Sequence, residues 1–176
     1  MQPMANIALR AARKAADFIL LSFDRPDQLR IEEKTSKDFV SNIDKRAEEI
    51  IVEQIQTTYP THNILAEESG TTQVDKSNEY TWIVDPIDGT LNFIRGIPHF
   101  AVSIGIQKGK HLEHGVIVDP INREEYVASR GYGATLNGKK IRVSSSESLQ
   151  DGLVSAGIAP SNINQRLESY IKNLQE

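Results

Sequence analysis

The connections between the apolar segments in the second half of the chain are too short to allow most sheet topologies. The turn-forming residues Gly109, Asp119 with Pro120, and Asn137 with Gly138 separate segments that have the character of strands. These segments span residues 100–106, 112–118, 124–128, 134–136 and 141–143. Because a parallel crossover needs about a dozen residues or more, strands joined this closely must pair antiparallel. The Asn-Gly pair is a strong signal for a tight hairpin.

Two amphipathic helices are predicted before these strands. The first has apolar residues at helical spacing: Met4, Ile7, Ala8, Ala11, Ala15, Phe18 and Ile19. The second spans residues 44–59, with Ser41 and Asp44 as a capping box at its start and Pro60 at its end. The charged residues 31–39 between them predict an extended or flexible loop. The expected fold is α+β, with a helix pair packed on an antiparallel sheet.

Composition excludes several classes of protein. With 39% apolar and 25% charged residues in 176, the chain is typical of a soluble globule. It has no cysteine, which excludes disulfides, thiolate catalysis and cysteine-bound zinc. The net charge of -4 argues against broad binding to nucleic acid or membrane. There is no apolar run typical of a signal peptide or a membrane span, so we expect a cytoplasmic protein with no membrane partner.

Two carboxylates follow a short apolar strand at residues 82–84. Asp85 and Asp88 lie three residues apart in a segment rich in turn-forming residues, where they can converge on one cation, and Mg²⁺ prefers such oxygen ligands. The carbonyl of Ile87 would add a neutral ligand and Thr90 a hydroxyl. A helix starting near Gly89 would direct free N–H groups toward a bound phosphate. Taken alone, two aspartates at this spacing also fit a simple turn.

Three more acids can each be interpreted in two ways, as structural residues or as part of a metal site. Glu67 and Glu68 follow the strand-like residues 64–66 and fit a solvated acidic turn. Alternatively, one of them shares the cation with Asp85, since neighbouring strand ends lie about 5 Å apart. Asp44 fits the start of a helix, where an acid meets the helix dipole favourably. It could equally accept a hydrogen bond from Thr90 and help to orient a water molecule. The four histidines have no metal-ligand spacing and are interpreted as structural or solvated.

These segments together resemble one family. Residues 67–70 followed by 82–93 resemble the first signature of the inositol monophosphatases, and residues 38–44 and 96–104 extend the match. The chain is most similar to the bacterial extragenic suppressor branch. The resemblance implies the N-terminal α+β layers of a layered αβαβα sugar-phosphatase fold. It also implies a Mg²⁺-dependent phosphomonoesterase, with Mn²⁺ as a substitute, that hydrolyses inositol monophosphate or a similar polyol phosphate by attack of metal-activated water. A homodimer is implied as well.

The resemblance also assigns roles to individual residues. Glu67, Asp85 and the Ile87 carbonyl would hold a first Mg²⁺, and Asp85 with Asp88 a second. Glu67 would also contact a third, weaker metal and counts among the catalytic residues. Thr90, paired with Asp44, would activate the attacking water. The N–H groups of Gly89 and Thr90 would bind the phosphate.

The chain departs from the family pattern in three places. Leu91 replaces a second threonine, and Arg95 stands where histidine is common. The second signature, a Trp-Asp segment followed by small residues, is missing. We therefore expect a truncated member with doubtful activity. Residues 1–145 would be the metal-binding domain. Residues 146–176, with a strand at 152–158 and a helix at 163–174, would begin an otherwise missing C-terminal α/β domain.

Two other functions compete with this interpretation. Haloacid-dehalogenase phosphatases also place aspartates after a strand, but their acids lie two apart on a parallel sheet and the first is a covalent nucleophile. The spacing here is three. The second alternative is non-catalytic: proteins of the extragenic suppressor branch also act in transcription antitermination, which implies antitermination factors or RNA polymerase as partners.

Overall fold

A computed structural model describes residues 2–25, 30–35, 38–72, 75, 77–148, 150 and 152, with the backbone alone at 32–35 and 38–40. The chain divides into two compact units, one of residues 1–32 with 39–142 and one of residues 33–38 with 143–176. All the candidate site residues belong to the first unit. The helix predicted at 163–174 and the strand predicted at 152–158, beyond its first residue, lie outside the described residues. The predicted domain division stays a prediction.

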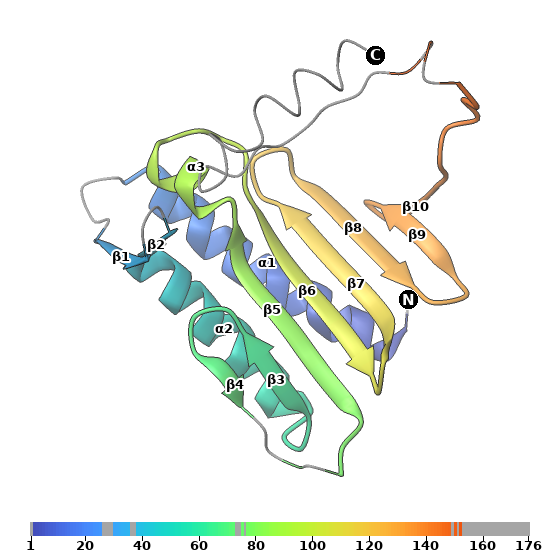
Figure 1. Ribbon diagram of the computed structural model, residues 1–176, viewed down its shortest axis with the longest axis horizontal. Coiled ribbons are helices and arrows are strands. Elements are labelled where there is room, and N and C mark those ends of the chain that lie inside the picture. The colour runs from blue at the N-terminus through green and yellow to red at the C-terminus, as the bar shows by residue number, and fades with distance from the viewer. Residues whose placement is uncertain are drawn as a thin grey trace. The chain divides into compact units, whose positions relative to one another are not determined.

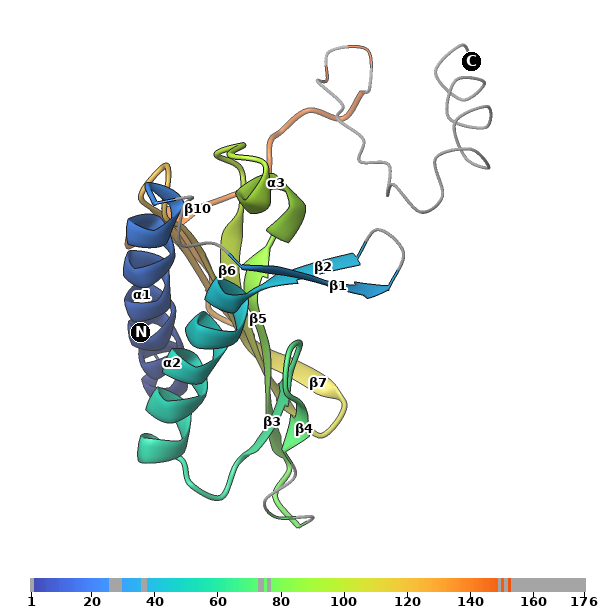
Figure 2. The same ribbon diagram turned by 90° about the vertical axis from the view of Figure 1, so that its left-hand side faces the viewer.

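Helices α1 (Pro3–Phe23) and α2 (Asn42–Thr58) pack against each other on one face of the main sheet (Figures 1 and 2). Both were predicted. The buried face of α1 is largely alanine, so α2 and the sheet can approach it closely. α2 begins as predicted: Ser41 accepts hydrogen bonds from the N–H groups of Ile43 and Asp44, and Asp44 accepts one from the N–H of Ser41. This capping box ties the Asp44 carboxylate to the helix start.

The main sheet has eight strands in the order β10-β9-β8-β7-β6-β5-β3-β4. Their bounds are β3 Asn63–Ala66, β4 Gly70–Thr72, β5 Tyr80–Asp88, β6 Ala101–Lys108, β7 His111–Asp119, β8 Glu124–Ser129, β9 Gly133–Leu136 and β10 Lys139–Ile141. The short helix α3 (Thr90–Ile94) follows β5. From β5 to β10 every neighbouring pair is antiparallel, which confirms the predicted meander. Asn137 and Gly138 have positive φ of 49° and 78°, as a tight two-residue hairpin requires.

The predicted antiparallel sheet has one exception, at β3. This strand runs parallel to β5, with Ala66 opposite Val84, and pairs antiparallel with β4 on its other side. The connection from β3 to β5 covers residues 67–79, which is long enough for a parallel crossover. The sheet is therefore mixed, and β3 and β5 end at the same edge.

Two further segments differ from the sequence interpretation. Residues 31–39 are not simply a loop: β1 (Ile31–Thr35) and β2 (Asp38–Ser41) form a two-stranded sheet of their own. The strand expected to end at Val84 continues to Asp88 through an irregularity in its pairing with β6. The turn expected at Pro86 is therefore a bulge within a strand.

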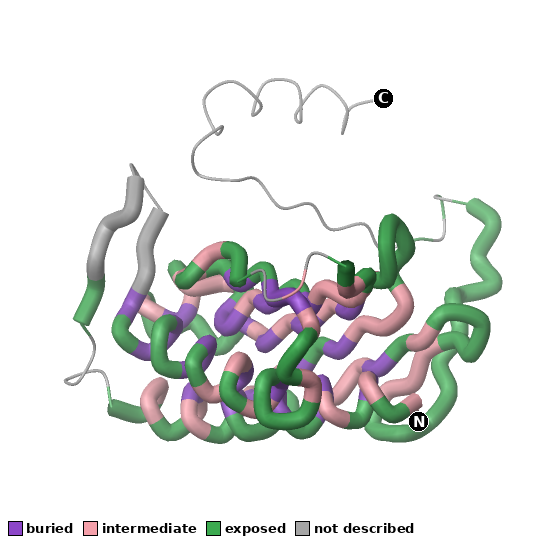
Figure 3. Tube along the Cα trace, turned by 90° about the horizontal axis from the view of Figure 1, so that it is seen from below, coloured by how far each residue is buried: buried purple, intermediate pink, exposed green. Residues whose placement is uncertain are grey.

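The core lies between the helix pair and one face of the main sheet (Figure 3). Its largest fully buried side chains include Trp82 from β5, Ile104 and Ile106 from β6, and Ile51 and Ile55 from α2. The strands alternate between this core face and the opposite face, which carries partly exposed apolar residues such as Leu65 and Ile83. In the part of the chain that the structure describes, no helix is long and apolar enough to cross a membrane.

Candidate metal centre

The parallel pairing of β3 and β5 brings Glu67 next to Asp85. Ala66 lies opposite Val84, so the next residues along the two strands, Glu67 and Asp85, are neighbours at the sheet edge. The N–H of Glu67 donates to the carbonyl of Val84 at 3.1 Å, which continues the pairing by one residue. Two carboxylates that are 18 positions apart in sequence are thereby held side by side.

The bulge in β5 places Asp88 on the same face as Asp85. Residues three apart in a regular strand point to opposite faces. Here Asp85 lies opposite Ser103 and Asp88 opposite Ala101, so one extra residue of β5 is accommodated between them. Because Ser103 and Ala101 are two apart and flank the buried Val102, both aspartates belong to the face opposite the helix pair.

Asp85 is the most strongly perturbed acid of this group. Burial, the neighbouring charge of Glu67, a hydrogen bond with Glu67 and the charge of Asp88 together raise the pKa of Asp85 to about 8. Its Oδ1 is buried and has no hydrogen-bond partner, the one such side-chain atom within the described ranges. A buried carboxylate oxygen without a partner is costly. A bound divalent cation would supply the missing partner and neutralise the adjacent charges.

These residues suit Mg²⁺, which keeps some water ligands, better than a metal ion that takes all of its ligands from the protein. Among the residues that the structure describes, no three acidic, histidine or cysteine side chains converge closely enough to hold an ion by themselves. Mg²⁺ usually binds through one or two carboxylates and retains several waters. Glu67 and Asp85 meet that need, and the Ile87 carbonyl oxygen, which lies 2.9 Å from the Thr90 hydroxyl oxygen, has two lone pairs and so can also face a cation. Their role as metal ligands stays a prediction.

Thr90 and Asp44 are in contact, as the sequence resemblance implied. The Thr90 hydroxyl lies 3.1 Å from Oδ1 of Asp44, whose side chain is 1% exposed. The other carboxylate oxygen accepts hydrogen bonds from the N–H and the hydroxyl of Ser41. The helix cap and the contact with Thr90 therefore coexist, because one oxygen caps the helix and the other meets Thr90, while a role in orienting water stays a prediction. Burial raises the pKa of Asp44, and the hydrogen bonds from Ser41 and Thr90 oppose that rise.

Gly89 connects β5 to α3 in a conformation that favours glycine. Its φ is +96°, in the left-handed region, and a Cβ there would lie 3.0 Å from the carbonyl oxygen of His99. The sharp turn places the first amides of α3 directly after Asp88. The first N–H groups of a helix have no acceptor within it, which leaves them available to an anion.

Glu48 is a residue that the sequence interpretation missed. It is a buried acid on α2, with 3% of its surface exposed. Its two carboxylate oxygens accept hydrogen bonds from the N–H groups of Glu68 at 2.7 Å and Ser69 at 2.8 Å. The available signal was its position one helical turn after Asp44, beside Ala47 and Ile51 on the apolar face, where a charged residue needs a partner.

A cavity of about 350 Å³ opens beside Asp88. It is lined by Asp88, Gly89, Asn92, His99, Phe100, Ala101 and Asp119. Asp119 was interpreted as a turn residue, and its carboxylate does accept hydrogen bonds from the N–H and the side-chain amide of Asn122. It also forms part of the cavity wall. The cavity is large enough for a small polar molecule and reaches Asp88.

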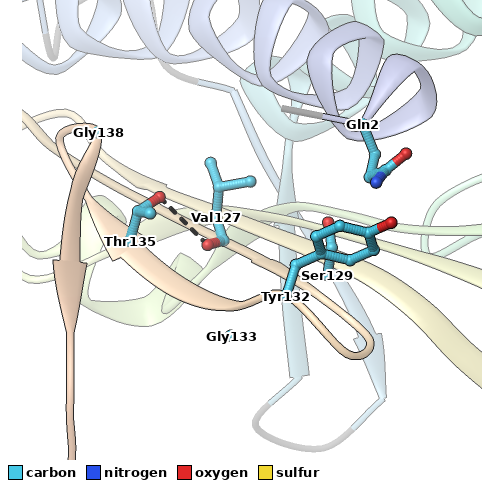
Figure 4. Close-up of a pocket in the computed structure, with 7 residues that line it drawn as sticks. All are labelled: Gln2, Val127, Ser129, Tyr132, Gly133, Thr135 and Gly138. Atoms are coloured by element: carbon cyan, nitrogen blue, oxygen red, sulfur yellow. Dashed lines mark hydrogen bonds between the residues drawn. The ribbon is translucent and has the colours of Figure 1, made fainter.

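A second cavity, of about 320 Å³, lies at the β8–β9 hairpin (Figure 4). It is lined by Gln2, Val127, Ser129, Tyr132, Gly133, Thr135 and Gly138. The hydroxyl of Thr135 is bonded to the carbonyl of Val127 at 3.3 Å and thus belongs to the hairpin itself. This lining contains no carboxylate or imidazole, so it offers none of the ligands that a Mg²⁺ site needs.

Two of the histidines have clear structural contacts. His62 accepts a hydrogen bond from the indole N–H of Trp82 at 3.0 Å and stacks with the rings of Tyr59 and Tyr80. Burial lowers its pKa, in keeping with a neutral ring that accepts this bond. His114 contacts the hydroxyl of Ser129 at 2.9 Å. His99 is exposed and also lines the cavity beside Asp88.

Comparison with known proteins connects this geometry to one family. The model of the "Inositol monophosphatase family" matches residues 1–176. The Nus factor SuhB of Pseudomonas aeruginosa is 47% identical over 174 residues, which cover 97% of this chain and 64% of the relative.

Two solved structures are similar in fold as well as in sequence. The extragenic suppressor protein suhB of Bartonella henselae is 37% identical with a TM-score of 0.80, over 82% of this chain and 56% of that one. An IMPase of Thermotoga maritima is 32% identical with a TM-score of 0.83, over 97% of this chain and 65% of that one. The chain thus spans less than two thirds of the length of each relative.

Proposed function

Because this chain belongs to the inositol monophosphatase family, we propose that it forms the metal-binding part of a Mg²⁺-dependent phosphomonoesterase. The observation that carries the proposal is the buried, unpartnered Oδ1 of Asp85, a carboxylate that interacts with Glu67 and with the charge of Asp88. Burying such a carboxylate costs free energy when no cation is bound, and a bound cation would offset that cost. The family match supports the same chemistry from independent evidence.

Each acid has a proposed role toward the metal. Glu67, Asp85 and the Ile87 carbonyl would hold a first Mg²⁺, and Asp85 with Asp88 a second, with Mn²⁺ as a substitute. Bound there, the ions would supply positive charge for the phosphate and for the attacking oxygen. The third, weaker metal near Glu67 stays an expectation of the family resemblance.

Thr90 and Asp44 would accept the proton of the attacking water. The Thr90 hydroxyl has one hydrogen and two acceptor sites, so it can donate to Asp44 while accepting from a water molecule. Burial raises the pKa of Asp44, which makes it a better proton acceptor than an exposed aspartate. Transfer of the proton toward Asp44 would leave the oxygen free to attack phosphorus. No covalent phosphoenzyme is expected.

The substrate would be a phosphate monoester of inositol or of a similar polyol. The N–H groups of Gly89 and Thr90 would bind the phosphate. The cavity of about 350 Å³ beside Asp88 would accept part of the alcohol, and it offers Asn92 and His99 as polar contacts. Because the chain spans 64% of the Pseudomonas relative, turnover by the chain itself belongs to this proposal. A homodimer, which sedimentation equilibrium would test, also belongs to it.

The test is phosphate release from inositol 1-phosphate, with and without Mg²⁺, under single-turnover conditions in ¹⁸O-labelled water. Release should be slow, in keeping with the doubtful activity expected from the sequence, but it should depend on Mg²⁺ and be lost in Asp85→Asn, with label in the phosphate and none in any carboxylate. The Asp17→Asn variant, which carries the same chemical change on exposed helix surface, should behave as the wild type. Label in Asp85, or release that Mg²⁺ does not affect, would contradict the mechanism.

A second candidate function is supported by the name Nus factor that the SuhB relative carries. We propose that this chain could also act as a binding partner in transcription antitermination, contacting antitermination factors or RNA polymerase. We expect partner binding not to need the metal ligands, so the two functions separate experimentally. Purified RNA polymerase should then bind the wild type and Asp85→Asn equally. Failure of both to bind would contradict this second function and leave the first intact.

A further inference from the structure

The inward face of α2 carries two buried acids that contact two different parts of the site. Asp44 and Glu48 are four residues apart and therefore lie on the same side of the helix, one turn from each other. Asp44 contacts Thr90 at the start of α3. Glu48 contacts the segment that directly follows Glu67. One helix face thus touches both segments that carry the proposed chemistry.

Three consecutive amides fix the backbone at Glu67. Its own N–H is bonded to the carbonyl of Val84, and the next two N–H groups, of Glu68 and Ser69, are both bonded to the carboxylate of Glu48. Hydrogen bonds to an ionised acceptor are stronger than neutral ones, and two from one carboxylate also fix direction. Because the Glu48 side chain is almost fully buried, water competes little for these bonds.

This restraint acts where like charges oppose the arrangement. Glu67, Asp85 and Asp88 are all acids, so when they are ionised to receive a cation their like charges favour movement of Glu67 away from β5. The turn after β3 is short and leads directly into β4, with Ala66 opposite Gly70, and Glu48 adds a restraint on this turn from α2. A clamp on the two residues that follow Glu67 counters that movement.

We propose that Glu48 is a positioning residue, which holds the turn at residues 67–69 so that Glu67 stays beside Asp85 and is ready to bind the metal. The inference rests on the proposed function, because it assumes that Glu67 and Asp85 bind Mg²⁺. It assigns Glu48 no contact with substrate or metal. Helix α2 then supports both halves of the site, Thr90 through Asp44 and Glu67 through Glu48.

The first test measures Mg²⁺ affinity by calorimetry in the full 176-residue chain. Glu48→Gln should weaken binding about tenfold to a hundredfold, the range found when a supporting residue behind a metal ligand is changed. Glu53→Gln makes the same change on the exposed side of the same helix and should leave the affinity unaltered. Amide exchange of Glu68 and Ser69 should accelerate in Glu48→Gln and remain slow in Glu53→Gln. Unchanged affinity in a folded Glu48→Gln would overturn the proposal.

A double-mutant comparison separates positioning from general stabilisation. If Glu48 acts through Glu67, then Glu48→Gln should reduce Mg²⁺ affinity by no more than about twofold in a Glu67→Gln background. Full additivity of the two losses would overturn the proposal. If Glu48→Gln does not fold, Glu48→Asp, which retains the charge but shortens the reach, takes its place with the same two outcomes.

Asp85→Asn distinguishes failure of this inference from failure of the proposed function. Wild-type Mg²⁺ affinity in Asp85→Asn would overturn the metal site, and the role of Glu48 with it. Weakened binding in Asp85→Asn with normal binding in Glu48→Gln would overturn the role of Glu48 alone.

Discussion

Glu67 and Asp85 are neighbours at one edge of the sheet because the strands that carry them, β3 and β5, run parallel. Had these strands been antiparallel neighbours, their C-terminal ends would lie at opposite edges and the two carboxylates would be separated by the length of the strands. The single parallel pair in an otherwise antiparallel sheet therefore creates the proposed site. Its cost is like-charge repulsion, which makes several properties of the chain sensitive to pH and metal.

Stability without Mg²⁺ should fall as pH rises. The pKa of Asp85 is raised in the folded chain from an ordinary 3.8 to about 8, so folding favours its protonated form. That contribution is complete below the unfolded pKa and is lost as pH rises through the folded one. Thermal unfolding in a chelator should show a falling Tm between about pH 4 and about pH 8, and Asp85→Asn should flatten the slope. An equally steep slope in Asp85→Asn would assign the effect to other groups.

Gly89→Ala should be more harmful than Gly109→Ala. Both glycines have positive φ, +96° and +58°, so both substitutions carry a backbone penalty of about 1 kcal/mol. At Gly89 the new Cβ also lies 3.0 Å from the carbonyl oxygen of His99, whereas at Gly109 it meets nothing within 4 Å. Urea denaturation should give a larger loss for Gly89→Ala, by about 1–2 kcal/mol. Equal losses would mean that the turn relaxes without cost.

Ser41→Ala should destabilise the chain through the start of α2. The Ser41 hydroxyl accepts from two helix N–H groups and donates to Asp44. Loss of such a cap costs about 1–2 kcal/mol. Thr57→Ala at the other end of α2, where the hydroxyl only contacts the carbonyl of Glu53, should cost less. Denaturation of the two variants side by side measures the difference, and a smaller loss in Ser41→Ala would be inconsistent with the cap.

Much of the fold could be predicted from local signals. The meander follows from connections too short for a crossover, and the β9–β10 hairpin from Asn137 with Gly138. The parallel pairing of β3 could not be predicted, because residues 67–79 contain no helix signal to mark a crossover. The same residues are long enough to permit it, so only the packed sheet decides between the two directions.

The candidate site, like the fold, could be predicted from the sequence only in part. Asp85 and Asp88 could be selected because they are close in sequence, although the bulge that brings them to one face leaves no pattern. The pairing of Asp44 with Thr90 was one of two even alternatives on the residues alone, since 46 positions separate them, and the family resemblance selected it. Glu48 was missed because its partners are backbone N–H groups, which any residue supplies. Contacts of this kind depend on where the helix packs and not on the identity of the partner.

Thr90→Val should separate the contribution of the Thr90 hydroxyl from that of the side-chain shape. The substitution keeps the volume and removes the hydrogen bond to the buried Asp44, which should cost about 1.5–3 kcal/mol of stability. Thr90→Ser restores a hydroxyl and should recover most of that loss. The two variants are compared by chemical denaturation, and a Thr90→Ser variant no more stable than Thr90→Val would show that the methyl group matters instead.

The central claim, that Glu67 and Asp85 form a Mg²⁺ site, is tested most directly by titrating Mg²⁺ into the chain in a calorimeter. The wild type and the exposed control Asp17→Asn should bind Mg²⁺ with the same affinity. Asp85→Asn should bind at least about tenfold more weakly, because it loses a charged ligand at the centre of the site. Equal Mg²⁺ affinity in the wild type and Asp85→Asn would contradict the account.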